Sequence, residues 1–436
     1  MELAGRLNFT ALPHNGWPRL ASLFAILPLA AGIVFRTYQN EVDPLAFELV
    51  RQLDLLFLLI EIVVIATARR HSFAYGHFFR ALPLDVRWAA IVFLATFWIG
   101  SVFVTHLTPY SIIRAALWPV HLVFGASLWH LSAGESRETL RRIVLVLIAG
   151  YVAYLPLLAA HFWLAPGPEP LRLGRVVWTS ALPGYLSVRH FGIEMGVLLA
   201  MLLGTIWRDA RIGGTTVLAF VAVAVVGGAV CWSGTRAAML GVAGAIAITI
   251  VARRRLPARA TAMLVLAALI VGGVLSTRFL PPDPAFGFRL MPDPSAEDFS
   301  SGRLQIWKDA ADLILARPLT GWGEGSFIWL RAADKMAYAH PHNVVLQMLQ
   351  SWGVPGALAV LYLIARLWLE MNRRGRDNAW LLPALMAFDA LLVMSMVDGI
   401  LFHARMIMLV AFVAVIALAR PAHQRPCDPQ RQTSSE

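Results

Sequence analysis

Runs of about 20 apolar residues recur along this sequence, separated by short polar segments, and they constrain its fold more than any other feature. A helix needs about 20 mostly apolar residues to cross a lipid bilayer. The runs lie near residues 20–35, 45–67, 88–106, 112–132, 141–164, 191–207, 214–232, 235–252, 259–277, 343–370, 379–397 and 402–419. The sequence therefore predicts an all-α integral membrane protein with about 12 transmembrane helices, organised as a single polytopic membrane domain over residues 1–436.

The shortage of charge supports this prediction. Charged residues make up 14% of the chain and hydrophobic residues 58%, whereas soluble domains carry about 25% charged residues. The net charge of +11 would also suit a nucleic-acid partner. However, the arginines stand in short clusters between the apolar runs, which is typical of membrane topology signals. Membrane lipid is therefore the expected environment, and no nucleic-acid partner is predicted.

The arginine clusters also predict an orientation. Every even-numbered apolar run is followed by a short basic segment, and such segments remain in the cytoplasm. Both chain termini are therefore predicted to be cytoplasmic, with residues 421–436 as a disordered tail. Two longer connections, 165–190 and 278–342, are predicted to lie on the outer side. Only the second is long enough to fold by itself.

Residues 278–342 are expected to contain short helices. One should begin near Arg303, capped by Ser300 or Ser301, and end before Pro318. The glycine-rich segment 321–325 then predicts a turn with positive φ values. It resembles a phosphate loop only weakly, because no βαβ unit surrounds it. The face of the helix expected to be buried consists of Leu304, Trp307, Ala311 and Ile314.

Four residues at the outer ends of predicted helices suit chemistry on an anionic substrate. Arg303 lies in the first turn of the loop helix, Arg236 in the hairpin between two spans, and Arg189 just before another span. Guanidinium groups can neutralise a departing diphosphate. His342 precedes the span at 343–370, and a helix start disfavours the imidazolium. The sequence therefore predicts a neutral imidazole that accepts a proton from an attacking hydroxyl.

Simpler explanations remain open at this point. An arginine at a membrane boundary is often an interfacial anchor, and His342 is also suited to helix capping. His340 and His342 would supply two metal ligands, but no third ligand has suitable spacing, so no metal is predicted. Ionisable residues inside spans are functional candidates by default, although those in the second span also have helical spacing for pairing. These candidates are Glu48, Asp54, Glu61 and Asp389, for the last of which the sequence suggests no partner.

Several of these segments together resemble the O-antigen ligase and polymerase superfamily. The resemblance rests on three motifs within residues 230–360: Ser-Gly-Thr-Arg ending at Arg236, Ser-Gly-Arg-Leu at 301–304 followed by Arg-Pro-Leu-Thr-Gly-Trp-Gly at 317–323, and His-Pro-His-Asn at 340–343. Thr235 departs from the family pattern, which more often has serine there. The order and spacing of the motifs are specific for the superfamily and less so for the member.

The resemblance implies a GT-C-like glycosyltransferase without a metal or other cofactor. It implies transfer of O-antigen polysaccharide from undecaprenyl diphosphate to lipid A–core at the periplasmic face of the bacterial inner membrane, with inversion at the anomeric carbon. His342, Arg303 and Arg236 would be catalytic. The expected contacts to the diphosphate or glycan are Arg189, Arg289, His340 and Asn343.

Rival functions remain on the same scaffold. The superfamily also contains glycan polymerases and enzymes that transfer glycans to protein, and a second histidine in the motif leaves His340 as an alternative base. A transporter or flippase would use charges inside spans. Such proteins often contain internal repeats, and none is visible in this sequence.

Overall fold

The computed structural model describes residues 55–105, 108–132, 135, 137–164, 185, 188–207, 214–279, 302–331 and 340–418. All regular secondary structure in these segments is helical, which confirms the predicted fold class. The elements are α3 (Leu55–Arg70), α4 (Tyr75–Ala81), α5 (Leu84–Ile99), η1 (Gly100–Val104), α6 (Thr108–Ser132), α7 (Arg137–Leu164), α9 (Val188–Ile206), α10 (Gly214–Ser233), α11 (Arg236–Val251), α12 (Arg259–Ser276), η3 (Thr277–Phe279), α13 (Arg303–Ala316), α14 (Phe327–Arg331), α15 (Val344–Asp377), η6 (Ala379–Leu381), α16 (Leu382–Ser395), η7 (Ile400–Phe402) and α17 (Ala404–Leu418).

Six of the described helical segments are long and apolar enough to cross a membrane: Leu84–Val104, Pro109–Ser132, Glu138–Pro156, Val188–Ile206, Arg259–Ser276 and Val344–Arg376. Four shorter apolar helices accompany them: Val217–Ser233, Arg236–Val251, Ala379–Ser395 and Ala404–Leu418. The protein is thus an all-helical, multi-pass membrane protein. The first predicted span, 20–35, lies outside the described residues, so the total of twelve stays a prediction.

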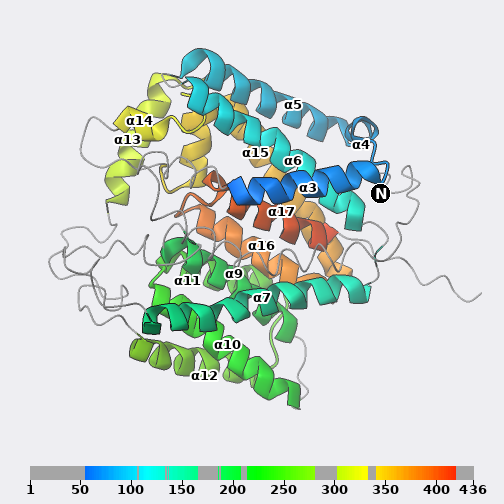
Figure 1. Cartoon of the computed structure of the whole chain (residues 1–436), viewed down its shortest axis with the longest axis vertical. Coiled ribbons are helices and arrows are strands. Elements are labelled where there is room, and N and C mark those ends of the chain that lie inside the picture. The colour runs from blue at the N-terminus through cyan, green and yellow to red at the C-terminus, as the bar shows by residue number, and fades with distance from the viewer. Residues whose placement is uncertain are drawn as a thin grey trace, which may run out of the picture.

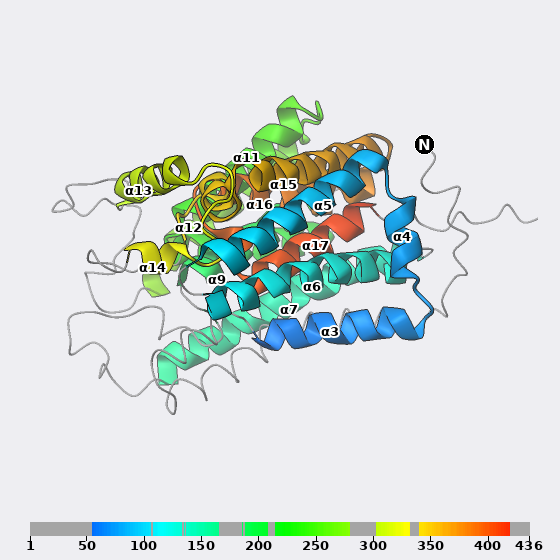
Figure 2. The ribbon, with the colours of Figure 1, turned by 90° about the horizontal axis from the view of Figure 1, so that it is seen from above.

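The helices run side by side in two groups joined by α16 and α17 (Figure 1). One group contains α3, α5, α6 and α15, and the other contains α9, α10, α11 and α12. Helix α16 packs against α9 and α11, while α17 packs against α6 and α15. Figure 2 shows α13 and α14 at one end of the bundle and α4 at the opposite end. We call these the loop end and the basic end.

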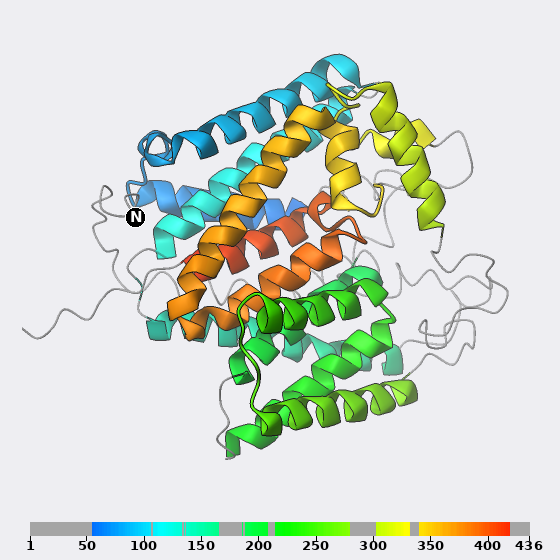
Figure 3. The ribbon, with the colours of Figure 1, turned by 180° about the vertical axis from the view of Figure 1, so that it is seen from behind.

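Helix α15 is broken one-quarter of the way along its length. Gly353 has φ 66° and ψ 179°, which interrupts the helix before Pro355. A side chain at Gly353 would place its Cβ 2.4 Å from the carbonyl oxygen of Leu319, so only glycine fits. Figure 3 shows the short first segment turned away from the long second segment. The predicted span at 343–370 is thus present but interrupted at Gly353, and His342 lies just before its short first segment at the loop end.

Residues 317–323 fill this break. The N–H groups of Trp322 and Gly323 donate to the carbonyls of Gln350 (2.9 Å) and Ser351 (3.0 Å), and the N–H of Val354 donates to Pro318 (2.7 Å). Irregular backbone in a membrane protein requires such internal partners. The predicted turn is confirmed, because the three glycines at 321, 323 and 325 have φ values of 62°, 86° and 69°.

Helix α13 starts and ends where the sequence predicts, but two details differ. The N-cap position is Gly302, with φ 77° and no side-chain hydrogen bond, not the predicted serine; Ser300 and Ser301 lie outside the described residues. The buried residues are Ile306 and Ala310, which pack with Phe327, whereas Leu304 is 64% exposed. The predicted face was only partly right, since Trp307 packs against this cluster. The difference arises because α13 packs against the first segment of α15 and against α14, a contact that periodicity alone does not orient.

Candidate functional site

The centre of the site is a contact between His342 and Asp398. The two residues lie 56 positions apart, His342 just before α15 and Asp398 in the connection between α16 and α17. Nδ1 of His342 lies 2.9 Å from Oδ1 of Asp398, and their side chains are only 13% and 9% exposed. Asp398 also accepts a hydrogen bond from the N–H of Gly399 (2.8 Å).

The ionisation of Asp398 determines which ring nitrogen of His342 carries a proton. Burial by itself would raise the pKa of the Asp398 carboxyl, but the hydrogen bond from His342 and the nearby histidines bring that pKa well below its usual range. An ionised carboxylate only accepts hydrogen bonds, so Nδ1 of His342 carries the proton. Nε2 is the other ring nitrogen, and it is the atom that would accept a proton if His342 acts as a base. A carboxylate that orients a histidine in this way also stabilises the imidazolium after proton transfer.

Sequence analysis missed Asp398. The available signal was an acidic residue, followed by glycine, in the short connection between two predicted spans, on the same side as the large loop. Nothing in the sequence pairs that connection with His342, because the contact depends on how α15, α16 and α17 pack.

His340 has different surroundings. It is 6% exposed, its ring centroid lies 4.4 Å from that of His342, and its Nδ1 accepts the N–H of His342 (3.2 Å). Burial, with a further contribution from the charge of His342, brings the pKa of His340 well below its usual value. His340 is therefore a neutral residue that supports the backbone of the motif. This arrangement favours His342 over His340 as the base, and a substrate contact for His340 stays a prediction.

Arg303 lies within electrostatic range of Asp398 and of the two other predicted arginines, Arg189 and Arg236. Burial lowers the pKa of Arg303. The charges of Arg189 and Arg236 lower this pKa further, whereas the charge of Asp398 raises it. The four charges therefore share one electrostatic environment. Arg303 and Arg236 are the first residues of α13 and α11, and Arg189 is the second residue of α9. Three helix N-termini, whose free N–H groups favour anions, therefore coincide with three guanidinium groups. Such an arrangement suits a multiply charged anion.

The remaining predicted contacts have separate outcomes. Arg289 lies outside the described residues. Asn343 caps α15 by accepting the N–H of Leu346 (3.1 Å), and its amide donates to the carbonyl of Met396 (2.8 Å). Asn343 thus ties the His342 segment to the connection that carries Asp398, and a contact to substrate stays a prediction.

The predicted functional charges inside the spans have protein partners instead. Asp389 of α16 accepts from Arg253 (2.6 Å), a partner that the sequence did not suggest. Glu61 of α3 lies 2.7 Å from Nδ1 of the buried His121. Both pairs join helices that are distant in sequence. Glu48 and Asp54 lie outside the described residues.

Asp398 also offers a third potential metal ligand next to His340 and His342. Sequence analysis predicted no metal for want of a third ligand, yet His340, His342 and Asp398 each place a potential ligand atom within 4.8 Å of the others. In the structure, Nδ1 of His342 and Nδ1 of His340 are already engaged in hydrogen bonds. The absence of a metal therefore stays a prediction, with a test given below.

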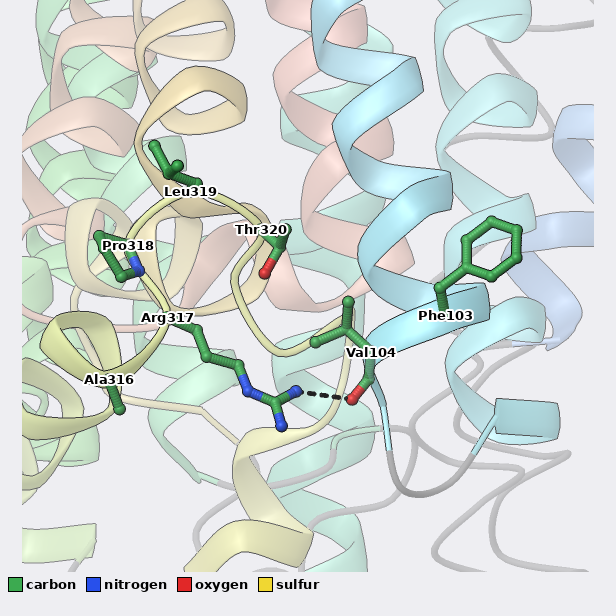
Figure 4. A pocket seen from close by; sticks show the side chains of 7 residues that line it. All are labelled: Phe103, Val104, Ala316, Arg317, Pro318, Leu319 and Thr320. Atoms are coloured by element: carbon green, nitrogen blue, oxygen red, sulfur yellow. Dashed lines mark hydrogen bonds between the residues drawn. The ribbon is translucent and has the colours of Figure 1, made fainter.

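An open cavity of about 480 Å³ lies between η1 and the end of α13. Phe103, Pro318 and Leu319 contribute to its lining. Figure 4 shows the guanidinium of Arg317 reaching across to the carbonyl of Val104, at 2.8 Å. The same guanidinium stacks 3.8 Å from the ring of Trp322. Arg317 thus fastens the end of α13 to η1, and the cavity contains none of the predicted site residues.

Comparison with known proteins agrees with this geometry. The family model described as O-antigen ligase matches residues 220–361, a segment that contains Arg236, Arg303 and His342. An O-antigen ligase of Pseudomonas aeruginosa is 24% identical over 292 residues, covering 66% of this chain and 64% of the relative. The match thus spans less than two thirds of that relative's length. Together, these matches support the resemblance to the O-antigen ligase superfamily, which is carried by residues 220–361.

Proposed function

We propose that this protein is a glycosyltransferase that moves O-antigen polysaccharide from undecaprenyl diphosphate to lipid A–core. The observation that supports this most directly is the His342–Asp398 pair beside three arginines at helix N-termini. A sugar hydroxyl needs a base, and a diphosphate leaving group needs positive charge. Both are present within one partly buried site. The segment matched by the O-antigen ligase family model contains Arg236, Arg303 and His342.

In the proposed reaction, the acceptor hydroxyl gives its proton to Nε2 of His342 while its oxygen attacks the anomeric carbon of the donor. The bond from that carbon to the diphosphate oxygen breaks, and its electron pair leaves with the diphosphate. Asp398 stabilises the imidazolium that forms. Arg303, Arg236 and Arg189 neutralise the departing charge. A single displacement without a covalent intermediate inverts the configuration of the anomeric carbon.

A glycan polymerase or a protein-directed transferase would use the same groups and differ in the acceptor. The decisive experiment supplies the purified protein with undecaprenyl-diphosphate-linked glycan and, in separate reactions, with lipid A–core, a second lipid-linked glycan or an acceptor protein. We expect product only with lipid A–core and none from the His342→Ala variant. Product only with lipid-linked glycan would identify a polymerase, and no product with any acceptor would contradict transfer.

The same proposal places the protein in the inner membrane, with both termini in the cytoplasm and the loop end in the periplasm. Its support is that Arg69 and Arg70 end α3 and Arg253 follows α11 at the basic end, in agreement with the positive-inside rule. Cysteines introduced at 295 or 330, in a background where Cys231 and Cys427 are serine, should react with an impermeant thiol reagent in intact spheroplasts. Labelling only after lysis would reverse the orientation and contradict a periplasmic site.

A further inference from the structure

A buried ion pair joins the large loop to the membrane helices close to the site. The guanidinium of Arg114, on α6, lies 3.4 Å from the carboxylate of Glu324, and their side chains are 4% and 1% exposed. Glu324 follows the glycine-rich turn that fills the break in α15. Its carboxylate accepts the indole N–H of Trp352 (3.1 Å), and its carbonyl accepts from Ser111 (2.8 Å).

The same guanidinium has a second attachment, on the Asp398 side of the site. It donates to the carbonyl of Phe402 (2.6 Å) and lies 4.0 Å from the centre of the Phe402 ring. That ring contacts His340, with centroids 5.0 Å apart. Phe402 belongs to the connection that carries Asp398. One side chain of α6 therefore holds this connection directly and holds the loop through Glu324.

Glu324 reaches His342 through the backbone. Its turn supplies hydrogen bonds to the last residues of the helical segment 344–352, and His342 lies two residues before the start of that segment. Trp352, at the end of that segment, is fully buried and donates to Glu324 itself. His342 and Asp398 thus come from separate parts of the chain. Arg114 contacts Glu324, whose turn holds the His342 segment, and Phe402, which lies in the connection that carries Asp398.

Stability alone explains such a pair poorly. Replacing a buried ion pair by apolar residues of similar volume is often neutral or stabilising, whereas displacement of a reacting group by about 1 Å can reduce a rate by about 10²-fold. We propose that Arg114 and Glu324 are positioning residues that set the geometry between His342 and Asp398. This inference rests on the proposed function, in which that geometry governs proton transfer.

A double-mutant cycle tests the inference. Transfer is measured at saturating donor and acceptor for Arg114→Gln, Asp398→Asn and the double variant, with melting temperatures recorded for each. We expect Arg114→Gln to lower kcat by about 10–10²-fold with little change in KM. In the Asp398→Asn background the further loss should be below about 3-fold, because the geometry that Arg114 sets no longer matters. An equal loss in both backgrounds, or an unchanged kcat, would overturn the inference.

Two further variants distinguish a positioning role from a general loss of folding or stability. Glu324→Gln keeps the size of the side chain and an acceptor for Trp352, so it should fold even if Arg114→Gln does not, and should show the same non-additivity with Asp398→Asn. Arg253→Gln removes a matched buried pair at the basic end and should lower the melting temperature without a change in kcat. If His342→Ala and Asp398→Asn keep full activity, the proposed function itself fails. If only the non-additivity is absent, the positioning role fails and the function stands.

Discussion

The two ends of the helix bundle use arginine in opposite ways. At the basic end, the protein itself binds these side chains. Arg253 donates to Asp389 (2.6 Å) and to Asn372 (2.8 Å). Arg374 contacts Glu370 at 2.8 Å, and Arg255 donates to the carbonyl of Gly375 (3.0 Å). These residues neutralise one another or complete the ends of helices, so their role is to hold the fold together.

At the loop end, Arg317 and Arg114 also have protein partners, but three other arginines lie within range of one another's charge. Arg303, Arg236 and Arg189 lie close enough for the last two to lower the pKa of the first, and all three stand where helix N-termini add further positive potential. Asp398 offsets part of the repulsion among these like charges, and an anionic ligand would offset more. Strongly perturbed groups of this kind are concentrated at functional sites. The comparison teaches that the position of an arginine in the fold, rather than its presence, separates an anchor from a candidate ligand.

Removing His342 should have the largest effect on transfer. His342→Ala should lower the rate by about 10²–10⁴-fold, the usual cost of losing a general base. Its melting temperature should remain nearly unchanged and the lipid-linked donor should still bind, as measured by thermal unfolding and a donor-binding assay. If His342→Ala is active and His340→Ala is dead, His340 is the base. If both variants are active, another group accepts the proton.

The arginines provide the next test of the comparison. Arg303→Lys keeps the charge but loses the planar fork that binds two phosphate oxygens, so we expect a loss of about 10²-fold in rate. Arg236→Lys should behave similarly, measured in the same assay. Arg374→Lys at the basic end is the control and should leave the rate nearly unchanged. Near-normal transfer by both loop-end variants would make those residues interfacial anchors.

The basic end should show the reverse pattern of effects. Arg253→Gln leaves Asp389 buried without its cation, a change that typically costs about 3–5 kcal/mol of folding free energy. We expect a clear fall in the melting temperature and a change in kcat below about 3-fold. A large fall in kcat with unchanged stability would show that the basic end also takes part in the reaction, and the contrast between the two ends would then be wrong.

The smallest effect is expected from chelators. In the structure, Asp398 orients His342 by a hydrogen bond, and the proposed proton transfer needs no metal. Incubation with EDTA should therefore leave the transfer rate unchanged. Loss of activity that Zn²⁺ restores would instead show that His340, His342 and Asp398 hold a catalytic metal, and the role of His342 as a free base would be wrong.

The sequence by itself determined the membrane class, the location of the helices and the candidate groups on the large loop. These features are local. The free energy of transferring a segment into lipid depends on that segment's own composition, and motifs such as 317–323 and 340–343 are contiguous. For the same reason, the turn at 321–325 and the start of α13 at Arg303 were predicted correctly from nearby residues.

Only the tertiary structure decided which groups meet. Asp398 lies beside His342, Arg253 beside Asp389 and Arg114 beside Glu324, although each pair is separated by more than 50 residues. The buried face of α13 and the break at Gly353 likewise follow from what packs against them. In a chain made of similar apolar helices, the hydrophobic pattern indicates whether a helix is buried or faces lipid. It does not indicate which helix is its neighbour. The choice of partner follows from the close packing and hydrogen bonding of the assembled bundle.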